Sequence, residues 1–131
     1  MKTLIADDDS VCRLLLGRLL KKYGPCYCAV NGTETVAAVR MALEAGEPFD
    51  LICLDIMMPG MDGQEALQEI RALEAARGII SPGWAKIVMT TALCDSASIR
   101  TAMREQCDCF LVKPIRKEKL VDTLRTLQLV A

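Results

Sequence analysis

Several short apolar runs of the sequence end in residues that could do chemistry. The first run ends in the acidic triplet Asp7-Asp8-Asp9, and a later one ends in Asp55. Two further runs end in Thr90-Thr91 and in Lys113-Pro114. Because ligands of an open parallel sheet bind beyond the carboxyl ends of its strands, we expect these residues to meet at one rim.

Carboxylates gathered at one rim would repel each other, and this predicts a cation among them. Hard oxygen ligands favour Mg²⁺. A hydroxyl such as that of Thr91 and an ammonium such as that of Lys113 would suit the negative oxygens of a phosphoryl group. The expected chemistry is therefore phosphoryl transfer, in which positioning and charge neutralisation supply most of the catalysis.

The elements that position these residues form an alternation of short apolar runs and longer helical patterns, which indicates βα units. The runs are mostly continuous, as is typical of parallel strands buried on both faces. Five such units in 131 residues predict a single α/β, doubly wound domain. The predicted strands are Thr3–Ala6, Cys26–Val30, Leu51–Leu54, Ile87–Met89 and Cys109–Val112.

Five helices are predicted from the spacing of apolar residues. Asp62 and Glu65 form a capping-box pattern at the start of the third helix, and the fourth has the weakest apolar face. The apolar stripe of the first comprises Cys12, Leu15, Leu16, Leu19 and Tyr23. The expected helices run from about Ser10 to Tyr23, from an N-cap at Thr33, from Asp62, over about 95–106, and beyond Pro114.

The composition is that of a globular protein, with 52% hydrophobic and 25% charged residues. A net charge of −1 argues against a general nucleic-acid binder, and we interpret the cluster Arg116, Lys117 and Lys119 as a solvated helix start. No apolar run approaches the ~20 residues of a membrane span, and the N-terminus lacks the pattern of a signal peptide. These features predict a cytoplasmic protein that does not act at a membrane.

The seven cysteines follow no disulfide-framework spacing, and the chain has no histidine. We interpret the cysteines as small core residues in a reducing compartment. The pairs Cys26/Cys28 and Cys107/Cys109 have C-x-C spacing, but a metal site would need more ligands. A strand that places residues i and i+2 on one face accounts for these pairs.

Four segments, in order along the whole chain, resemble the receiver domains of response regulators in two-component signalling. The resemblance implies a flavodoxin-like (βα)5 fold with five parallel strands in the order 2-1-3-4-5. It also implies one receiver domain over residues 1–131, without an output domain. The segments are Thr3-Leu4-Ile5-Ala6-Asp7-Asp8-Asp9-Ser10, Asp50 to Gly63 (DLICLDIMMPGMDG), Met89-Thr90-Thr91-Ala92 and Phe110-Leu111-Val112-Lys113-Pro114.

The resemblance assigns an expected role to each acidic residue of the predicted rim. It implies that Asp55 attacks phosphorus and becomes an aspartyl-phosphate. Asp8 is expected to ligate Mg²⁺ directly and Asp7 through a bound water, while Asp55 and the backbone carbonyl of Met57 complete the protein ligands. Asp9 is interpreted as a first-turn residue that complements the helix dipole.

The remaining motif residues are expected to bind and sense the phosphoryl group. The resemblance implies that Thr91 hydrogen-bonds a phosphoryl oxygen, that Lys113 pairs with the group, and that small Ala92 keeps the acceptor reachable. Phe110 is the expected switch aromatic, which turns inward when Thr91 moves. The bond from Lys113 to Pro114 is expected to be cis.

Two apolar residues, Met57 and Leu93, occupy the positions that tune the lifetime of the phosphoryl group in this family. Neither side chain can orient a hydrolytic water. The resemblance therefore implies slow self-dephosphorylation, in a signalling module rather than an enzyme. The expected donor is a sensor histidine kinase or a phosphotransfer protein. The expected output is a changed surface of the fourth helix, fifth strand and fifth helix, read by a downstream protein or by a second copy of the chain.

Two alternatives of other classes stay open at this point. Asp7-x-Asp9-x-Val11 matches the nucleophile motif of haloacid-dehalogenase-type phosphatases, although only Glu118 and Asp122, both in the last helix, could supply the second acidic pair of that family. A receiver-like binding module that signals without phosphorylation is the other. A nucleotide-binding flavodoxin is disfavoured because no glycine-rich loop follows the first strand.

Overall fold

The computed structural model describes residues 1–80, 83–92 and 107–131. Within these ranges five strands form one parallel sheet in the order β2-β1-β3-β4-β5. This confirms both the predicted α/β fold and the strand order. The strands are β1 Thr3–Ala6, β2 Cys26–Ala29, β3 Leu51–Asp55, β4 Lys86–Thr91 and β5 Cys109–Val112.

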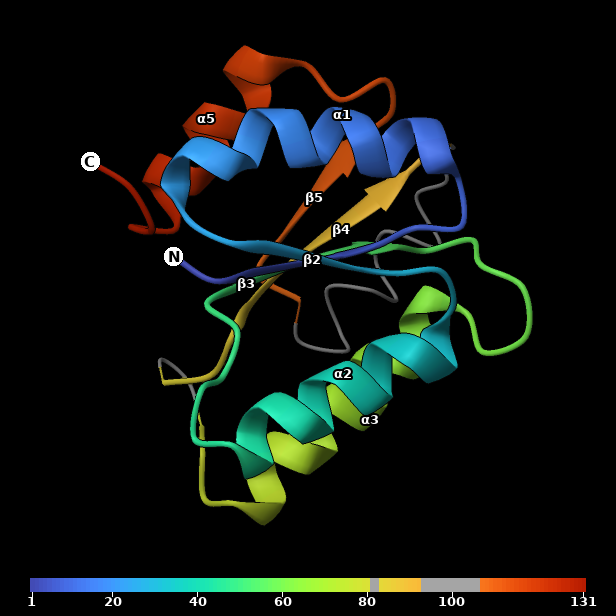
Figure 1. Cartoon of the computed structure of the whole chain (residues 1–131), viewed down its shortest axis with the longest axis vertical. Coiled ribbons are helices and arrows are strands. Elements are labelled where there is room, and N and C mark those ends of the chain that lie inside the picture. The colour runs from blue at the N-terminus through green and yellow to red at the C-terminus, as the bar shows by residue number, and fades with distance from the viewer. Residues whose placement is uncertain (81–82, 93–106) are drawn as a thin grey trace.

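Helices cover both faces of this sheet: α1 and α5 lie on one face, and α2 and α3 lie on the other (Figure 1). A 3₁₀ turn, Lys21–Tyr23, follows α1 directly. The helix predicted over about 95–106 falls outside the described residues. The described α-helices are α1 Ser10–Leu20, α2 Gly32–Glu44, α3 Gly63–Ala76 and α5 Lys117–Thr126.

Alternate residues of the central strands enter two separate cores. Ile52 and Leu54 of β3 belong to the core on the α2 and α3 side, whereas Leu51 and Cys53 belong to the core under α1 and α5. Since successive side chains of a strand point to opposite faces, β3 must be apolar at every position before Asp55. This explains the continuous apolar run in the sequence.

The strand β2 lies at an edge of the sheet and is more exposed than the central strands. Tyr27 is exposed, and so is Cys28, whereas Cys53 and Cys107 are buried. The prediction that the cysteines are core residues is therefore wrong for Cys28. Cys107 precedes β5, so the second C-x-C pair does not share a strand.

The helix α1 departs from the prediction in length and in its buried face. Its α-helical part ends at Leu20 and tightens into the 3₁₀ turn before Gly24, whose φ of 145° ends the helical path. Leu16 and Leu20 are its buried residues, while Leu15, placed on the apolar stripe by the spacing, is exposed.

The start of α2 corrects a predicted cap, and the start of α3 confirms one. Asn31, not Thr33, caps α2: its side chain accepts from the Glu34 backbone N–H at 2.8 Å. The Glu34 carboxylate reaches back past the cap and accepts from the backbone N–H of Val30 at 3.1 Å. Asp62 caps α3 as predicted, accepting from the backbone N–H of Glu65.

No helix among the described residues is long and apolar enough to cross a membrane. The basic cluster at residues 116–119 lies at the exposed start of α5, as predicted. The peptide bond between Lys113 and Pro114 is cis, which was also expected.

Candidate functional site

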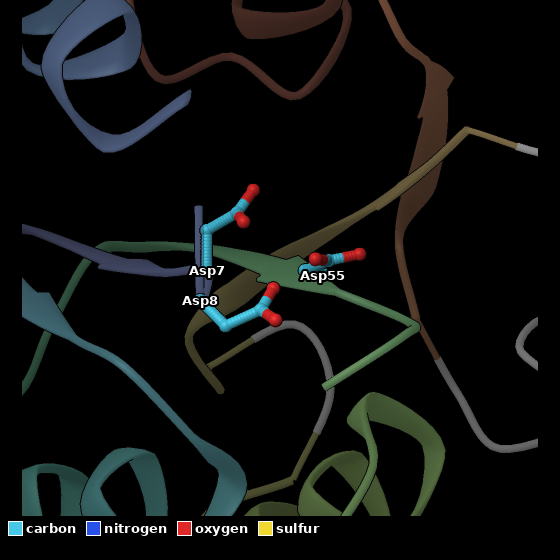
Figure 2. A group of neighbouring side chains, drawn as sticks. All are labelled: Asp7, Asp8 and Asp55. Carbon is cyan, nitrogen blue, oxygen red and sulfur yellow. The ribbon is translucent and has the colours of Figure 1, made fainter. Parts of the chain in front are cut away.

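Three carboxylates converge at the carboxyl ends of β1 and β3. The two strands are neighbours, with Ala6 paired to Leu54, so the residues that follow them lie side by side (Figure 2). Carboxylate oxygens of Asp7, Asp8 and Asp55 all lie within 4.8 Å of one another. Asp7 and Asp55 are buried, whereas Asp8 is exposed.

The Lys113 ammonium joins this group from the end of β5. Its Nζ lies 3.0 Å from Asp7 Oδ2 and 3.3 Å from Asp55 Oδ2. The backbone N–H of Lys113 donates to the carbonyl of Thr91 at 2.7 Å, and this bond fixes the point from which the side chain extends. One cation therefore faces two buried carboxylates.

Burial and the neighbouring charges shift the pKa values of Asp55 and Lys113 in the protein without metal. Burial, and next the negative charge of Asp7, raise the pKa of Asp55 from the ordinary 3.8 to about 6, although Lys113 and the backbone N–H of Met57 pull it down. Burial alone would lower the pKa of Lys113, but the adjacent Asp7 carboxylate and the charge of Asp55 outweigh it and raise this pKa. The negative charge of the carboxylates therefore exceeds what Lys113 alone can offset, and a bound cation would lower the pKa of Asp55.

The backbone around Asp55 is held by local hydrogen bonds. Its Oδ1 accepts from the backbone N–H of Met57 at 3.1 Å. The carbonyl of Ile56 accepts from the backbone N–H of Gly63 at 3.0 Å, which draws the start of α3 against the end of β3. The Met57 side chain is 62% exposed beside this turn, while Leu93, its expected partner in tuning the lifetime, lies outside the described residues.

The residues expected to bind and sense the phosphoryl group lie on or just after two neighbouring strands. Thr91 ends β4, Ala92 follows it, and Phe110 lies on β5. Thr91 is buried at the end of β4, and Ala92, directly after it, is exposed. Phe110 of β5 is half-buried and packs against the core on the α2 and α3 side. Thus β4 brings Thr91 to the same rim as Asp55, whose pairing partner is Thr90.

Asp9 has a different position from the one expected. It is the N-cap of α1, and its Oδ1 accepts from the backbone N–H of Val11 at 2.9 Å. Its backbone N–H donates to Asp7 Oδ1. The Asp9 carboxylate thus caps its own helix, and it is not among the carboxylates that converge at the rim in the described part of the chain.

Two residues that shape the site, Arg13 and Gly63, were given no role there from the sequence. The Arg13 guanidinium donates to the backbone carbonyl of Asp7 at 2.7 Å. Gly63 lies so close to β3 that a Cβ there would overlap the carbonyl oxygen of Asp55 and lie 2.8 Å from Ile56 Cα. Nothing in the spacing of Arg13 pointed to the site, whereas the glycine after Asp62 was a visible signal of close backbone approach.

The donor set of the site matches a hard divalent cation. Only oxygen atoms are offered, and Mg²⁺ prefers carboxylate and carbonyl oxygens in octahedral surroundings. Asp7 Oδ2 is buried without an aligned hydrogen bond, although the Lys113 ammonium lies 3.0 Å away. The residues Asp7, Asp8 and Asp55 could therefore hold such an ion.

Comparison with known proteins agrees with this geometry. The family model described as the response regulator receiver domain matches residues 3–125. The Sensory/regulatory protein RpfC of Xanthomonas campestris pv. campestris (strain 8004) is 35% identical over 127 residues, which are 97% of this chain and 16% of that protein. The chemotaxis protein CheY of Bacillus subtilis (strain 168) is 29% identical over 128 residues, covering 94% of this chain and 93% of CheY.

The similarity to receiver domains also holds for the three-dimensional structure. The receiver domain of the histidine kinase CKI1 from Arabidopsis thaliana, complexed with Mg²⁺ and BeF₃⁻, superposes with a TM-score of 0.83 at 28% identity, over 98% of this chain and 90% of that one. This chain spans only 16% of the length of RpfC, so the comparison with that protein concerns the receiver part alone. The chain belongs to the response regulator receiver domains, and within that family it is a phospho-accepting signalling module.

Proposed function

We propose that Asp55 is the residue that accepts the phosphoryl group, and that a sensor histidine kinase or a histidine phosphotransfer protein supplies it. The observation that carries this proposal is the convergence of Asp7, Asp8, Asp55 and Lys113 at one rim of the sheet. Asp7 and Asp55 both lie at the ends of buried strands and both face Lys113. Asp55 is favoured because it ends β3, the middle strand of the sheet, and because its segment resembles the acceptor segment of receiver domains.

The transfer is an in-line displacement. A carboxylate oxygen of Asp55 attacks the phosphorus of a phosphohistidine, a P–O bond forms, and the P–N bond breaks with its electron pair returning to the imidazole. Lys113, which already lies 3.3 Å from Asp55, stays beside the phosphoryl oxygens and offsets their charge. The Thr91 hydroxyl donates to one of these oxygens, and the small side chain of Ala92 leaves the acceptor reachable.

Mg²⁺ is part of this proposal. Asp7, Asp8, Asp55 and the backbone carbonyl of Met57 would hold it, with Asp7 acting through a water. When bound, the ion neutralises negative charge on the phosphoryl oxygens. The receiver domain of CKI1 was crystallised with Mg²⁺ and BeF₃⁻, and the oxygen-only donor set here supports the same choice.

The output of the proposed switch is a change in the surface around β5 and α5. Thr91 would move toward the phosphoryl group and Phe110 would turn inward behind it, so that a downstream protein or a second copy of the chain reads the altered face. The half-buried position of Phe110 supports this, because its ring has a core to enter.

Free thiols at the described cysteines also fit the cytoplasm as the compartment.

Incubation with acetyl phosphate and Mg²⁺, followed by intact-mass measurement, tests the proposed function. We expect a gain of one phosphoryl group in the wild type, no gain in Asp55→Asn, and a strong loss when Mg²⁺ is removed by a chelator. Asp122→Asn, a change at an exposed α5 residue, serves as the matched control and should gain mass like the wild type.

The same experiment separates the alternatives. No gain in the wild type, together with absent Mg²⁺ binding, would favour a module that signals without phosphorylation. An equal gain in Asp55→Asn would move the acceptor to the Asp7–Asp9 segment and contradict the proposal.

A further inference from the structure

The loop between β3 and α3, residues 56–62, carries the Met57 carbonyl that is expected to bind the metal. Its C-terminal end is fixed against the acceptor strand by Gly63, through the close approach described above. Within the loop, Met58 is buried in the core that also contains Val36 of α2. The position of the Met57 carbonyl therefore depends on the contacts that the other residues of the loop make with the neighbouring helix α2.

The turn of this loop rests on the first residue of α2. A Cβ built on Gly32 would overlap the carbonyl oxygen of Met61 and lie 2.8 Å from the Met61 Cβ. Gly32 is buried, and its lack of a side chain allows the two backbones to touch. Since the overlapping atom of Met61 belongs to the backbone, it cannot rotate away from a larger residue.

Gly32 is itself held firmly in relation to the acidic residues. Two hydrogen bonds fix the first turn of α2: Asn31 Oδ1 accepts from the Glu34 backbone N–H, and the Glu34 carboxylate accepts from the Val30 backbone N–H. Just before it, the carbonyl of Ala29 accepts from the backbone N–H of Asp7 at 3.1 Å. The same stretch of chain thus contacts the backbone of an acidic site residue on one side and the β3–α3 loop on the other.

We propose that Gly32 is a positioning residue for Mg²⁺ binding. Through its contact with Met61, Gly32 would hold the β3–α3 loop in the position from which the Met57 carbonyl could bind the ion together with the acidic residues. This inference rests on the proposed function, because it takes Met57 as a ligand. Gly32 lies at the start of α2, about 25 positions before Met57 in the chain. It would control the geometry of the site without contacting the ion.

The test compares Mg²⁺ affinity in Gly32→Ala with that in two controls, by calorimetric titration of folded protein. Gly17→Ala places the same methyl group where no atom lies within 4 Å, and Val39→Ala weakens the buried face of α2 about two turns further along the helix. We expect Gly32→Ala to bind Mg²⁺ about tenfold to a hundredfold more weakly and the controls to bind like the wild type. Amide NMR shifts of residues 56–62 should change in metal-free Gly32→Ala alone.

Unchanged Mg²⁺ affinity in folded Gly32→Ala, beside normal binding in the wild type, would overturn the positioning role and leave the proposed function intact. An equal loss in Val39→Ala would overturn it too, since the effect would then be general destabilisation. Failure of the wild type to bind Mg²⁺ would overturn both proposals. If Gly32→Ala does not fold, Asn31→Ala, which loosens the same turn, must weaken Mg²⁺ binding for the inference to stand.

Discussion

At the scale of single residues, the Asp55 carboxylate is held at an energetic cost in the protein without metal. Burial and the charge of Asp7 raise its pKa from 3.8 to about 6. Between these two values the folded state binds more protons than the unfolded state, so this group lowers stability as the pH rises from about 4 to about 6. Above pH 6 the whole penalty is present.

We therefore expect Asp55→Asn to stabilise the metal-free protein at pH 7. The gain in the free energy of unfolding should be about 1–3 kcal/mol, from a pKa shift of about two units reduced by the lost contact with Lys113. It should shrink toward zero near pH 4, where the wild-type carboxyl is itself neutral. Urea titrations at the two pH values, with chelator present, measure this difference, and a gain of equal size at both would contradict it.

The exposed Met57 side chain leads to a prediction about the phosphorylated state. Because a thioether cannot orient an attacking water, we expect the aspartyl-phosphate to persist well beyond seconds after excess donor is removed. Met57→Gln, which introduces an amide able to hold a water, should shorten the lifetime severalfold. Decay of the phosphorylated mass with time gives both rates, and loss of the group within seconds in the wild type would contradict the account.

The sequence predicted the identity of the polar residues at the rim well, but it predicted their arrangement there less well. Asp7, Asp8, Asp55 and Lys113 converge because each follows a strand of one parallel sheet, and strand ends can be read from apolar runs. Asp9 was placed one position late, in the first turn of α1 and not at its N-cap, since three adjacent aspartates give no sign of which one turns back to its own helix.

At the scale of elements, the caps of the helices fix where the loops of the site begin and end. Asp62 accepts from the Glu65 backbone N–H at 2.9 Å and starts α3 directly after the β3–α3 loop. We expect Asp62→Ala to lower the free energy of unfolding by about 1 kcal/mol. Thermal unfolding would measure it, with Asp122→Ala at the exposed α5 as the control; an unchanged transition would show that the cap contributes nothing.

The helix α1 offers a test of opposite sign. Gly17 lies in its interior, and a methyl group there would meet no atom within 4 Å. Gly17→Ala should therefore raise the free energy of unfolding by about 0.5–1 kcal/mol, through the lower entropy of the unfolded chain. Denaturant unfolding measures the change, and a loss of stability would mean that α1 needs the glycine for a contact absent from this structure.

Elements were predictable to the extent that burial determined their pattern. The strands β1, β3 and β4 are covered on both faces, so their apolar runs marked them clearly. The buried face of α1 was predicted wrongly at Leu15. In a helix rich in leucine, several sets of residues at helical spacing are equally apolar, and the sequence does not show which set is buried. The cap of α2 was placed at Thr33, two residues late, because Asn31 and Thr33 are both good capping residues.

At the scale of the whole molecule, a buried ionic cluster ties α3 to the starts of β4 and β5. The Arg71 guanidinium contacts Glu74 at 2.8 Å and Asp108 at 3.0 Å, and it lies over the Trp84 ring at 3.8 Å from the ring centre. The two carboxylates also accept from the backbone N–H groups of Ala85 and Ile87. The sequence could not show this, because a charged residue on a helix is ordinarily solvated.

Removing the cation of this cluster should weaken the whole fold. Arg71→Met leaves two largely buried carboxylates without their partner, and we expect a loss of about 3–5 kcal/mol in the free energy of unfolding. Arg125→Met breaks an exposed pair at 3.9 Å and should change stability by less than about 1 kcal/mol. Chemical denaturation of both variants makes the comparison, and similar losses would show that the buried cluster has no special role.

The family match extends over residues 3–125 of the molecule. The central claim concerns one atom group within that fold: the Asp55 carboxylate is where the phosphoryl group is attached. Reduction of the phosphorylated protein with borohydride converts an aspartyl-phosphate to homoserine, which peptide mass spectrometry can locate. We predict homoserine at Asp55 alone, and homoserine at Asp7, Asp8 or Asp9 instead would contradict the account.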